Sequence, residues 1–494
     1  MTKLKKPLAL TIIVFISSFF FFSLRLLDVP KGLTIDEIAF GYNGVIISET
    51  FRDETSRFAP IFALSINGKD WRQPVMQYFI VGFFKFFGPN LYNLKLTSVV
   101  IASLSSVLIF ILGKKLLGNL GAIMSVILFA TTPIILIHSH LALDNIMTIP
   151  FTLLWLLTFY WYEKTKNPKF LIGAGITLGI GFYSYKGMRS FVPIWSLLTL
   201  IYIAQPLIDK KTASTLAKIK KPLTIFITSI LPFYIVIPLL ERKYAGAVLG
   251  QVNIGGVGIY GFFRSYLSSF DPSFLFITGD EILNHSTGRH GMFLLATLPF
   301  FILGLVQVFK KGGFWILIAV SFFTGPLLFG FPGSIHRASR LIALSPFFIL
   351  IATLGFSKLY ENLKKYKWLL ITLVMLFVIN ASDFLNYYWF SYADDTFPIF
   401  YHSGIEPAYK ALDEKSAEKN LTPLVDSTIL KAEKTDEGYI NTFYRSIYFT
   451  SPPQSWTEDE QLPESSILLT RNSELKGLKK VEDNLNGFYL YTKN

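Results

Sequence analysis

Two adjacent carboxylates, Asp36 and Glu37, follow the first long apolar segment of the chain. A carboxylate in such a position can take a proton from a hydroxyl group, or bind a metal ion or a substrate. Because Thr34 precedes them, the same residues are also typical of a helix start, with a threonine cap and acidic residues in the first turn. The two interpretations are compatible, since a helix start holds a carboxylate in a fixed position. Asp36 and Glu37 are therefore candidate catalytic residues.

A third catalytic candidate, Asp144, stands at the start of an apolar segment, where its carboxylate must find a partner. His140 lies four residues earlier, so the two side chains share one face if the segment is helical. Together with His138 they are a set that could hold a divalent metal. The alternative is that Asp144 only caps the helix that follows. Apart from this candidate metal site, the sequence indicates no cofactor.

Basic and phenolic side chains gather in two further turns of the chain. The candidate ligands for a phosphate group are Lys186, Arg189, Arg337 and Arg340. The candidates for other substrate contacts are Tyr183, Tyr185 and His336. Lysine and arginine make charge-assisted hydrogen bonds to phosphate, and arginine can do so in a bidentate manner. The alternative is that these cations extend toward lipid headgroups.

The composition indicates what kind of chain positions these residues. Of the 494 residues, 52% are hydrophobic and 16% are charged, whereas a soluble chain has about 25% charged residues. The apolar residues form blocks of about 15–21, long enough to cross roughly 30 Å of hydrocarbon. The chain has no cysteine, which excludes disulfides, thiolate nucleophiles and cysteine-ligated metals. We predict an integral membrane protein, whose net charge of +13 is directed at membrane lipids and not at nucleic acid.

Eleven apolar blocks predict an all-α polytopic domain over residues 1–381. The predicted spans lie near residues 7–27, 94–112, 120–137, 146–162, 170–184, 189–206, 222–240, 291–309, 314–331, 340–357 and 367–381. A further apolar stretch, 74–88, contains Lys85 and ends in Gly88-Pro89. We interpret this stretch as an interfacial helix within a long outer loop.

Clusters of lysine and arginine near span ends mark the cytoplasmic side of a membrane protein. With eleven spans, one side receives Lys3/Lys5/Lys6, Lys114/Lys115, Lys164/Lys166/Lys169, Lys210/Lys211/Lys218/Lys220/Lys221, Lys310/Lys311 and Lys358/Lys364/Lys365/Lys367. The N-terminus is then cytoplasmic and the C-terminus extracytoplasmic, in a multi-pass protein of the plasma membrane. The outer face carries the loops 28–93 and 241–290 and the turns at 138–145, 184–189 and 332–340. The four candidate phosphate ligands lie on this face, which should be poor in positive charge, and this favours a phosphate site.

The tail, residues 382–494, differs in composition from the rest of the chain. It holds 11 basic and 18 acidic residues, a net charge of −7, which leaves +20 on the remainder. A helical stretch at 405–419 alternates with strand-like runs at 439–450, 466–470 and 488–492. The pattern predicts a small soluble α/β domain on the extracytoplasmic side.

The order of these features resembles the GT-C superfamily of integral membrane glycosyltransferases. The closest group is that of the protein O-mannosyltransferases and aminoarabinose transferases. The resemblance extends over about residues 1–400, whereas the tail is similar only in being an outward-facing soluble domain. It rests on Asp36-Glu37, Arg72-Gln73-Pro74-Val75-Met76-Gln77-Tyr78, Leu141-Ala142-Leu143-Asp144, the turn from Tyr183 to Arg189, and His336-Arg337-Ala338-Ser339-Arg340.

The resemblance implies a sugar donor linked to polyprenyl phosphate and used at the outer face of the membrane. Asp36 would match the catalytic carboxylate, Glu37 its neighbour and Asp144 the second acidic position. The lipid phosphate would be bound by Lys186, Arg189, Arg337 and Arg340. A single displacement by an acceptor hydroxyl would invert the anomeric configuration. Two departures from the pattern, the Tyr-Lys-Gly-Met-Arg turn and the His138-Ser139-His140 segment, leave the donor sugar and any metal requirement open.

Two other classes of function remain open at this point. A transporter or lipid flippase has a similar composition, but the polar residues here gather at outer turns and not in helices broken within the membrane. A non-enzymatic subunit that binds a sugar lipid is disfavoured only slightly by the Asp36-Glu37 pair. Nothing in the residues identifies the acceptor, which could be a lipid, a glycan or a protein.

Overall fold

The apolar segments of the chain are helical in a computed structural model that describes residues 5–209, 213–250, 258–331, 337–400, 405–431, 435–449, 453–482, 485 and 487–493. The chain divides into two compact units. The helical unit comprises Met1–Leu24, Ser98–His140 and Asp144–Tyr392. The mixed unit, which also contains strands, comprises Arg25–Thr97, Leu141–Leu143 and Ala393–Asn494.

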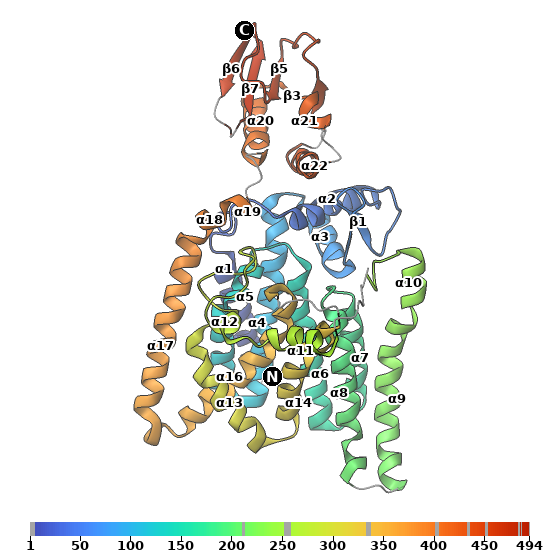
Figure 1. The fold of residues 1–494 in the computed structure, drawn as a ribbon, viewed down its shortest axis with the longest axis vertical. Coiled ribbons are helices and arrows are strands. Elements are labelled where there is room, and N and C mark those ends of the chain that lie inside the picture. The colour runs from blue at the N-terminus through green and yellow to red at the C-terminus, as the bar shows by residue number, and fades with distance from the viewer. Residues whose placement is uncertain are drawn as a thin grey trace. The chain divides into compact units, whose positions relative to one another are not determined.

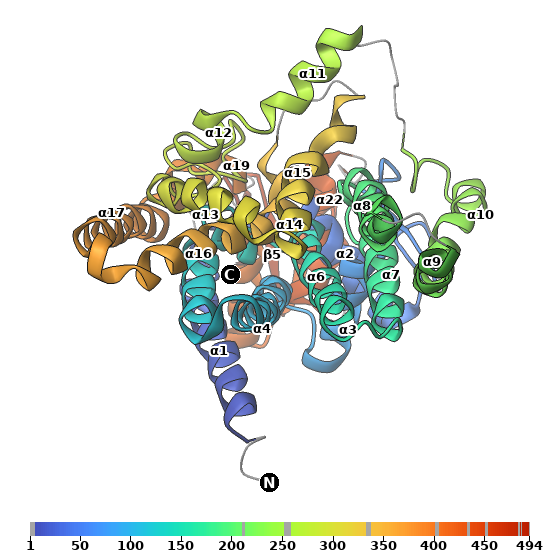
Figure 2. The ribbon, with the colours of Figure 1, turned by 90° about the horizontal axis from the view of Figure 1, so that it is seen from below.

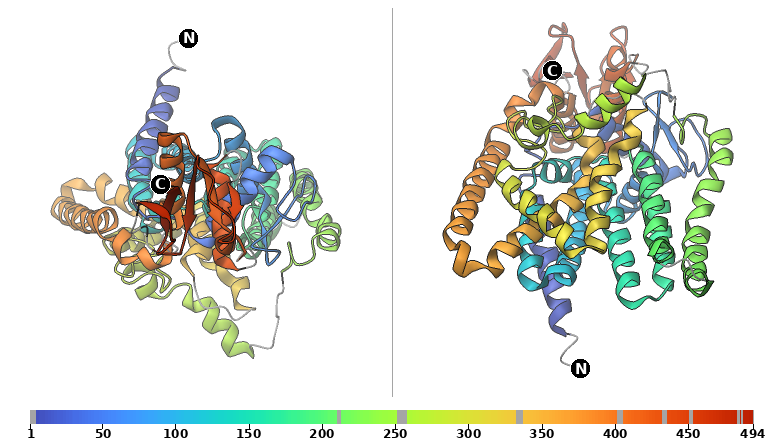
Figure 3. Two further views of the ribbon diagram at one scale, coloured as in Figure 1. Left: turned by 90° about the horizontal axis from the view of Figure 1, so that it is seen from above. Right: turned by 60° about the horizontal axis from the view of Figure 1, so that its bottom comes forward.

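Long helices dominate the helical unit, and Figures 2 and 3 show α6, α7, α8 and α9 side by side. Its helices are α1 (Lys5–Ser23), α4 (Leu91–Thr131, which begins in the mixed unit), α5 (Pro133–Ser139), η1 (Asp144–Met147), α6 (Thr148–Thr165), α7 (Lys169–Phe182), α8 (Met188–Asp209), α9 (Ala213–Ile235), α10 (Ile237–Lys243), α11 (Gly258–Ser268), α12 (Pro272–Phe276), η2 (Leu295–Thr297), α13 (Leu298–Lys311), α14 (Phe314–Thr324), η3 (Gly325–Gly330), α15 (Ala338–Leu341), η4 (Ile342–Leu344), α16 (Ser345–Glu361) and α17 (Leu363–Phe390).

Helix α4 is a hairpin of two helices that meet at Gly118. The backbone there leaves the helical region, with φ 77° and ψ −168°. A β-carbon on Gly113 would lie 2.7 Å from Oγ of Ser125, although these residues would be about 18 Å apart in a straight helix. The two halves must therefore fold back on each other. They correspond to the predicted span 94–112 and to the first part of the predicted span 120–137, the rest of which lies in α5.

Five of the described helices are long and apolar enough to cross a membrane. They are Leu91–Thr131, Met188–Leu207, Lys218–Lys243, Ala338–Glu361 and Leu363–Phe390. A bent pair, Pro133–Ser139 with Asp144–Thr165, is a sixth if it forms one span. Shorter apolar helices are Leu8–Ser23, Pro74–Phe87, Lys169–Phe182 and Phe314–Gly330. The multi-pass character is clear from this count, while the number of eleven spans stays a prediction.

Helices α13 and α16 pack with their backbones in contact at two glycines. A β-carbon on Gly304 would lie 1.9 Å from the carbonyl oxygen of Ile351, and one on Gly355 would lie 1.9 Å from that of Phe300. No side chain fits at either position without separating the helices. Small residues at such contacts are the usual means by which membrane helices approach closely.

The mixed unit combines the first long loop with the tail (Figure 1). Its sheet has the order β4-β3-β5-β7-β6, in which β3 is parallel to β4 and β5, and β7 is antiparallel to β5 and β6. Its elements are α2 (Ile35–Thr50), β1 (Ala63–Ser65), β2 (Asp70–Arg72), α3 (Pro74–Phe87), α18 (Tyr392–Asp395, which begins in the helical unit), α19 (Phe397–Phe400), α20 (Ile405–Lys419), β3 (Thr422–Asp426), α21 (Ser427–Lys431), α22 (Asp436–Tyr448), β4 (Gln454–Trp456), β5 (Ser466–Thr470), β6 (Leu478–Glu482) and β7 (Tyr489–Lys493).

The sequence prediction for the tail is correct for the helix 405–419 and for the strands near 466–470 and 488–492, and wrong for 439–450. That run forms most of helix α22, although its aromatic and β-branched residues favour a strand. The helix is started by Thr435, whose side chain accepts a hydrogen bond from the amide of Gly438. The acidic first turn that follows is favourable at a helix N-terminus.

Helix α22 contacts the first loop within the mixed unit. The ring of Phe443 lies against Gly41, where a β-carbon would be 2.7 Å away. The Tyr439 hydroxyl donates a 2.5 Å hydrogen bond to Oε2 of Glu54, and Asp436 pairs with Lys69 at 3.4 Å. The tail and the loop that carries Asp36 are therefore parts of one packed unit.

We expect Gly355→Val to destabilise the protein, because the new side chain would overlap the Phe300 carbonyl on α13. Overpacking of this kind costs about 1–3 kcal/mol, so the purified protein in detergent should unfold at a lower temperature. Gly82→Val is the matched control, since a β-carbon there has nothing within 4 Å. Equal shifts of the unfolding midpoint in the two variants would contradict the backbone contact between α13 and α16.

Candidate functional site

Asp36 lies in the first turn of helix α2, where the buried side chain of Arg72 holds its carboxylate. Nη1 of Arg72 lies 2.8 Å from Oδ1 of Asp36, and Nη2 lies 2.6 Å from Oδ2 of Asp70. Nε of the same guanidinium donates to Oγ of Ser65 at 2.7 Å. The Arg72 side chain is 5% exposed, whereas that of Asp36 is 53% exposed. The Asp36 carboxylate is thus fixed on one side and open to solvent on the other.

A short hairpin positions Arg72 for this contact. Strands β1 and β2 are antiparallel, with Ser65 opposite Asp70. The chain reverses at residues 66–68, whose φ angles of 55°, 55° and 82° all lie in the left-handed region. The guanidinium of Arg72 also lies over the ring of Phe40 on α2, 5.3 Å from its centroid. The hairpin therefore brings a rigid cation against the first turns of α2.

Glu37 lies in the same helical turn as Asp36 but is fully buried. Its Oε2 accepts hydrogen bonds from the amide and the hydroxyl of Thr34, at 2.9 and 3.0 Å. Its Oε1 accepts from the amide of Ala142 at 2.9 Å. Burial raises the pKa of Glu37, while the positive charge of Lys95 and these hydrogen bonds oppose the rise. Glu37 therefore caps α2 and ties the Leu141–Leu143 segment to it.

Two cations of the mixed unit were not among the predicted site residues. Lys95 is 2% exposed, donates to the carbonyl of Pro30 at 2.8 Å, and attracts the carboxylates of Glu37 and Glu406. Arg72 is the cation that holds Asp36. Arg72 lies in the predicted outer loop 28–93 and Lys95 at the outer end of the predicted span 94–112. The excess of lysine and arginine on the cytoplasmic side does not account for positive charge at these places. That anomaly is the signal by which the sequence could have identified them.

In the helical unit, Arg337 lies beside a buried carboxylate. Nη1 of Arg337 is 3.8 Å from Oδ1 of Asp280, and the two side chains are 40% and 3% exposed. Asp280 also accepts hydrogen bonds from the amides of Ala338, at 2.6 Å, and Ile282, at 3.0 Å. The carboxylate thereby fixes the backbone next to Arg337, and the guanidinium stays partly open to solvent.

Two histidines stack near this pair. The rings of His138 and His285 are 5.1 Å apart and almost parallel, at 6°, and their Nε2 and Nδ1 atoms are 3.1 Å apart. Burial, helped by the positive charge of Arg337, lowers the pKa of His285 to about 4. His285 is therefore neutral at pH 7 and adds no charge to the surroundings of Arg337.

The turn between α7 and α8 places its predicted residues differently. Lys186 is exposed. Arg189 donates from Nη2 to the carbonyl of Ala247 at 2.7 Å, and the buried Tyr183 donates from its hydroxyl to the carbonyl of Phe233 at 2.6 Å. Arg189 and Tyr183 thus hold parts of the helical unit together, and Lys186 is the most accessible cation of this turn.

The remaining predicted residues lie at separate places. Asp144 begins the short helix η1 and is half-buried. Tyr185 is half-buried in the α7–α8 turn, and Arg340 is half-buried in α15. His336 lies outside the described residues.

The predicted metal ligands do not come together as a site. Within the described ranges, no group of three or more His, Asp or Glu side chains could hold a metal ion. His138 faces His285, whereas His140 contacts the carbonyl of Phe22 at 2.8 Å and the hydroxyl of Tyr388 at 3.0 Å. His138, His140 and Asp144 therefore do not form the expected metal-binding set.

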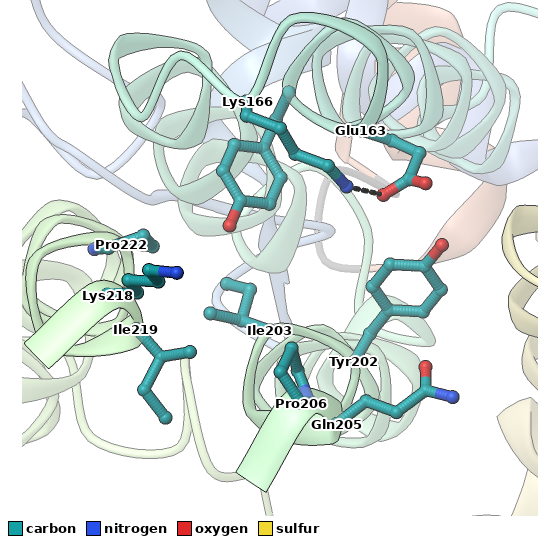
Figure 4. A pocket seen from close by; sticks show the side chains of 10 residues that line it. Glu163, Lys166, Tyr202, Ile203, Gln205, Pro206, Lys218, Ile219 and Pro222 are labelled. Atoms are coloured by element: carbon teal, nitrogen blue, oxygen red, sulfur yellow. Dashed lines mark hydrogen bonds and ion pairs between the residues drawn. The ribbon is translucent and has the colours of Figure 1, made fainter. Parts of the chain in front are cut away.

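A pocket of about 500 Å³ lies between α6, α8 and α9 (Figure 4). Lys166 and Glu163 form an ion pair of 2.8 Å at its wall, and Tyr202 and Lys218 also line it. Lys166 and Lys218 belong to basic clusters predicted on the cytoplasmic side, which the orientation rule explains. We therefore assign this pocket no part in chemistry at the outer face.

Comparison with known proteins confirms the resemblance drawn from the sequence. Residues 72–238 match the family described as dolichyl-phosphate-mannose-protein mannosyltransferase. The fold is similar to that of ArnT from Cupriavidus metallidurans in the apo state, with a TM-score of 0.56 and 9% identity over 97% of each chain. ArnT bound to undecaprenyl phosphate matches with a TM-score of 0.53 and 9% identity, over 88% of this chain and 75% of ArnT.

A weaker match is the oligosaccharyltransferase AglB from Archaeoglobus fulgidus, in complex with an inhibitory peptide and a dolichol-phosphate. Its TM-score is 0.49 at 13% identity, over 89% of this chain and 64% of AglB. No curated protein matches the chain in sequence. The fold is thus similar to that of ArnT, and residues 72–238 are similar in sequence to the mannosyltransferase family.

We expect Glu37→Ala to destabilise the protein strongly, because it removes the acceptor of the Thr34 and Ala142 amides. Each buried donor left without a partner costs about 1–3 kcal/mol. Thermal unfolding in detergent measures the loss. Glu49→Ala, at an exposed position of the same helix, should change stability by no more than about 0.5 kcal/mol. A Glu37→Ala protein as stable as the control would show that Glu37 is not an anchor.

Proposed function

We propose that the protein is a glycosyltransferase that transfers a sugar from a polyprenyl-phosphate donor to an acceptor hydroxyl at the outer face of the membrane. The observation that carries the proposal is the half-exposed Asp36 carboxylate, fixed by the buried Arg72 in a chain with the fold of ArnT. The crystal structure of ArnT with undecaprenyl phosphate supports a lipid-phosphate donor. The matching mannosyltransferase family supports the same class of donor.

Asp36 is the base in the proposed reaction. Its Oδ1 is occupied by Arg72, whereas Oδ2 has no hydrogen-bond partner among the described residues. Oδ2 takes the proton of the acceptor hydroxyl, whose oxygen attacks the anomeric carbon of the donor sugar. The bond between that carbon and the phosphate oxygen breaks, and the lipid phosphate leaves with the electron pair. Such a single displacement inverts the anomeric configuration.

The leaving lipid phosphate carries negative charge that cations must stabilise. Arg337 is the leading candidate, because Asp280 fixes its surroundings while 40% of its side chain stays exposed. Lys186, Arg189 and Arg340 remain proposed ligands, as do Tyr183, Tyr185 and His336 for other substrate contacts. We assign Glu37 a positioning role in place of a catalytic one, because it is fully buried. Asp144 is the second acidic candidate.

The proposed orientation follows from the basic clusters, with the N-terminus cytoplasmic, the tail extracytoplasmic and the plasma membrane as the site of action. An outer-face enzyme requires a donor that crosses the membrane, and a lipid-linked sugar meets this requirement. The sugar, hexose or pentose, can be identified by offering the purified protein a mixed pool of polyprenyl-phosphate sugars and measuring which one is consumed.

A transporter or flippase is the second candidate function, and one observation favours it. The pair Pro133–Ser139 and Asp144–Thr165 is bent by 120°, and helices broken in this way line the binding sites of many transporters. Formation of a glycosylated acceptor distinguishes the two, because a transporter moves its substrate without breaking the bond between sugar and phosphate.

We expect Asp36→Asn to lower turnover by about 10²–10⁴-fold, because an amide cannot accept the proton. Asparagine keeps the shape of the side chain and an oxygen for Arg72, so donor binding and folding should persist. Turnover is measured as release of lipid phosphate in the presence of an acceptor that the wild-type protein glycosylates. Asp70→Asn is the matched control, since it makes the same change in the other carboxylate partner of Arg72. Near-normal turnover in Asp36→Asn would remove Asp36 from the mechanism and make Asp144 the next candidate.

We expect Arg337→Ala to weaken use of the donor by about 1.5–3 kcal/mol, the value of a charged hydrogen bond. The measurement is the dependence of the transfer rate on the concentration of the donor lipid. Lys115→Ala, which removes a cation on the predicted cytoplasmic side, should leave donor use unchanged. Equal losses in the two variants would indicate general electrostatic attraction and no phosphate site at Arg337.

A further inference from the structure

A second pocket, of about 590 Å³, lies in the tail. It is formed by the connections 457–462 and 472–477, which follow β4 and β5, together with the start of β6 and the end of β7. Its size is within the range of about 300–1,000 Å³ that is usual for ligand sites. None of its residues takes part in the chemistry proposed for Asp36.

The floor of the pocket is apolar and continuous with the core of the domain. Trp456 and Leu462 line the pocket and belong to the buried cluster over one face of the sheet. Leu475 and Leu478 line it as well and pack against that cluster. The pocket is therefore supported by the folded core and not by loops alone.

One buried donor in this floor lacks a partner. Trp456 is 5% exposed, and its indole Nε1–H has no hydrogen-bond acceptor among the described residues. Indole N–H groups can only donate, and buried ones are normally satisfied. A ligand that brings an oxygen acceptor beside the indole would satisfy this donor.

The rim of the pocket combines acceptors and donors. The carboxylates of Glu458, Glu460 and Glu474 are acceptors, the ammonium groups of Lys476 and Lys493 are donors, and the amides of Gln461 and Asn472 can do both. Nδ2 of Asn472 donates to Oε1 of Glu458 at 2.7 Å, and Oδ1 of Asn472 accepts from the amide of Glu474 at 3.0 Å. These two contacts fix the geometry of one part of the rim.

We propose that this pocket binds a neutral carbohydrate. A hydroxyl group both donates and accepts, which matches a rim of mixed donors and acceptors. The C–H face of a sugar ring can pack on the apolar floor, as apolar groups do on aromatic and aliphatic side chains. Three carboxylates against two ammonium groups in the lining give no excess of positive charge for a phosphate or an acidic glycan. This assignment rests on the proposed function: the bound carbohydrate is a glycan acceptor, held in the domain that packs on α2.

The test is binding of oligosaccharides to the full-length protein, in a detergent without a sugar headgroup, because alkyl glycosides would compete for the pocket. Saturation-transfer NMR is recorded with maltoheptaose, cellohexaose and mannohexaose, with hyaluronate hexasaccharide as an acidic glycan and with a lysine-rich peptide. We expect at least one neutral oligosaccharide to bind, and Glu458→Ala and Asn472→Ala each to weaken it about tenfold. Glu418→Ala is the matched control, since Glu418 is 62% exposed and neither it nor its partner Lys415 lines the pocket.

Unchanged unfolding temperatures in the rim variants will show that they are folded. The proposal is overturned if no neutral oligosaccharide binds, or if the rim variants bind it as tightly as the control. It is also overturned if the rim variants weaken binding of the peptide or the acidic glycan only. The Asp36→Asn protein should bind the oligosaccharide normally. If the wild-type protein binds the oligosaccharide but consumes none of the polyprenyl-phosphate sugars in the mixed pool, the proposed function is contradicted and the carbohydrate site still stands.

Discussion

The arrangement around Asp36 depends on the hydrogen bonds that the buried carboxylate of Glu37 accepts. Its two oxygens accept hydrogen bonds from Thr34 and from Ala142, which are far apart in the chain. A buried carboxylate is tolerable only when it is hydrogen-bonded and balanced by charge. Lys95 supplies part of that balance. These bonds fix the start of α2. They therefore also fix the position of the preceding residue, Asp36, whose side chain faces solvent.

Asp36 and Glu37 are neighbours with opposite surroundings, and helix geometry explains the difference. Consecutive residues of an α-helix point about 100° apart, so one faces the interior and the other faces solvent. The Glu37 carboxylate accepts hydrogen bonds from Thr34 and Ala142 with both of its oxygens. The Asp36 carboxylate uses Oδ1 for Arg72, and Oδ2 stays available. Arg72 restricts the Asp36 carboxylate without covering it. In the proposed reaction, a base fixed in this way loses little conformational freedom when substrate binds.

The tail contributes to the same unit through α22. Contacts of Tyr439 with Glu54, of Phe443 with Gly41 and of Asp436 with Lys69 attach it to the loop that carries Asp36. The buried core of the same domain supports the pocket around Trp456. A domain that packs on α2 and has a pocket of its own, with an apolar floor and a polar rim, fits the acceptor binding proposed for it.

The sequence by itself determined the features that depend on neighbouring residues. Apolar runs of the right length predict the helices, Thr34 with Asp36 and Glu37 predicts the start of α2, and turn residues predict where the outer cations lie. Only the tertiary structure decided which charges are partnered: Arg72 with Asp36, Glu37 with Ala142, and Arg337 with Asp280. It also decided that 439–450 is mostly helix and that the predicted metal ligands stay apart. The physical reason is that hydropathy and capping act over a few residues, whereas the partner of a buried charge depends on where distant segments return, 105 positions later for Ala142.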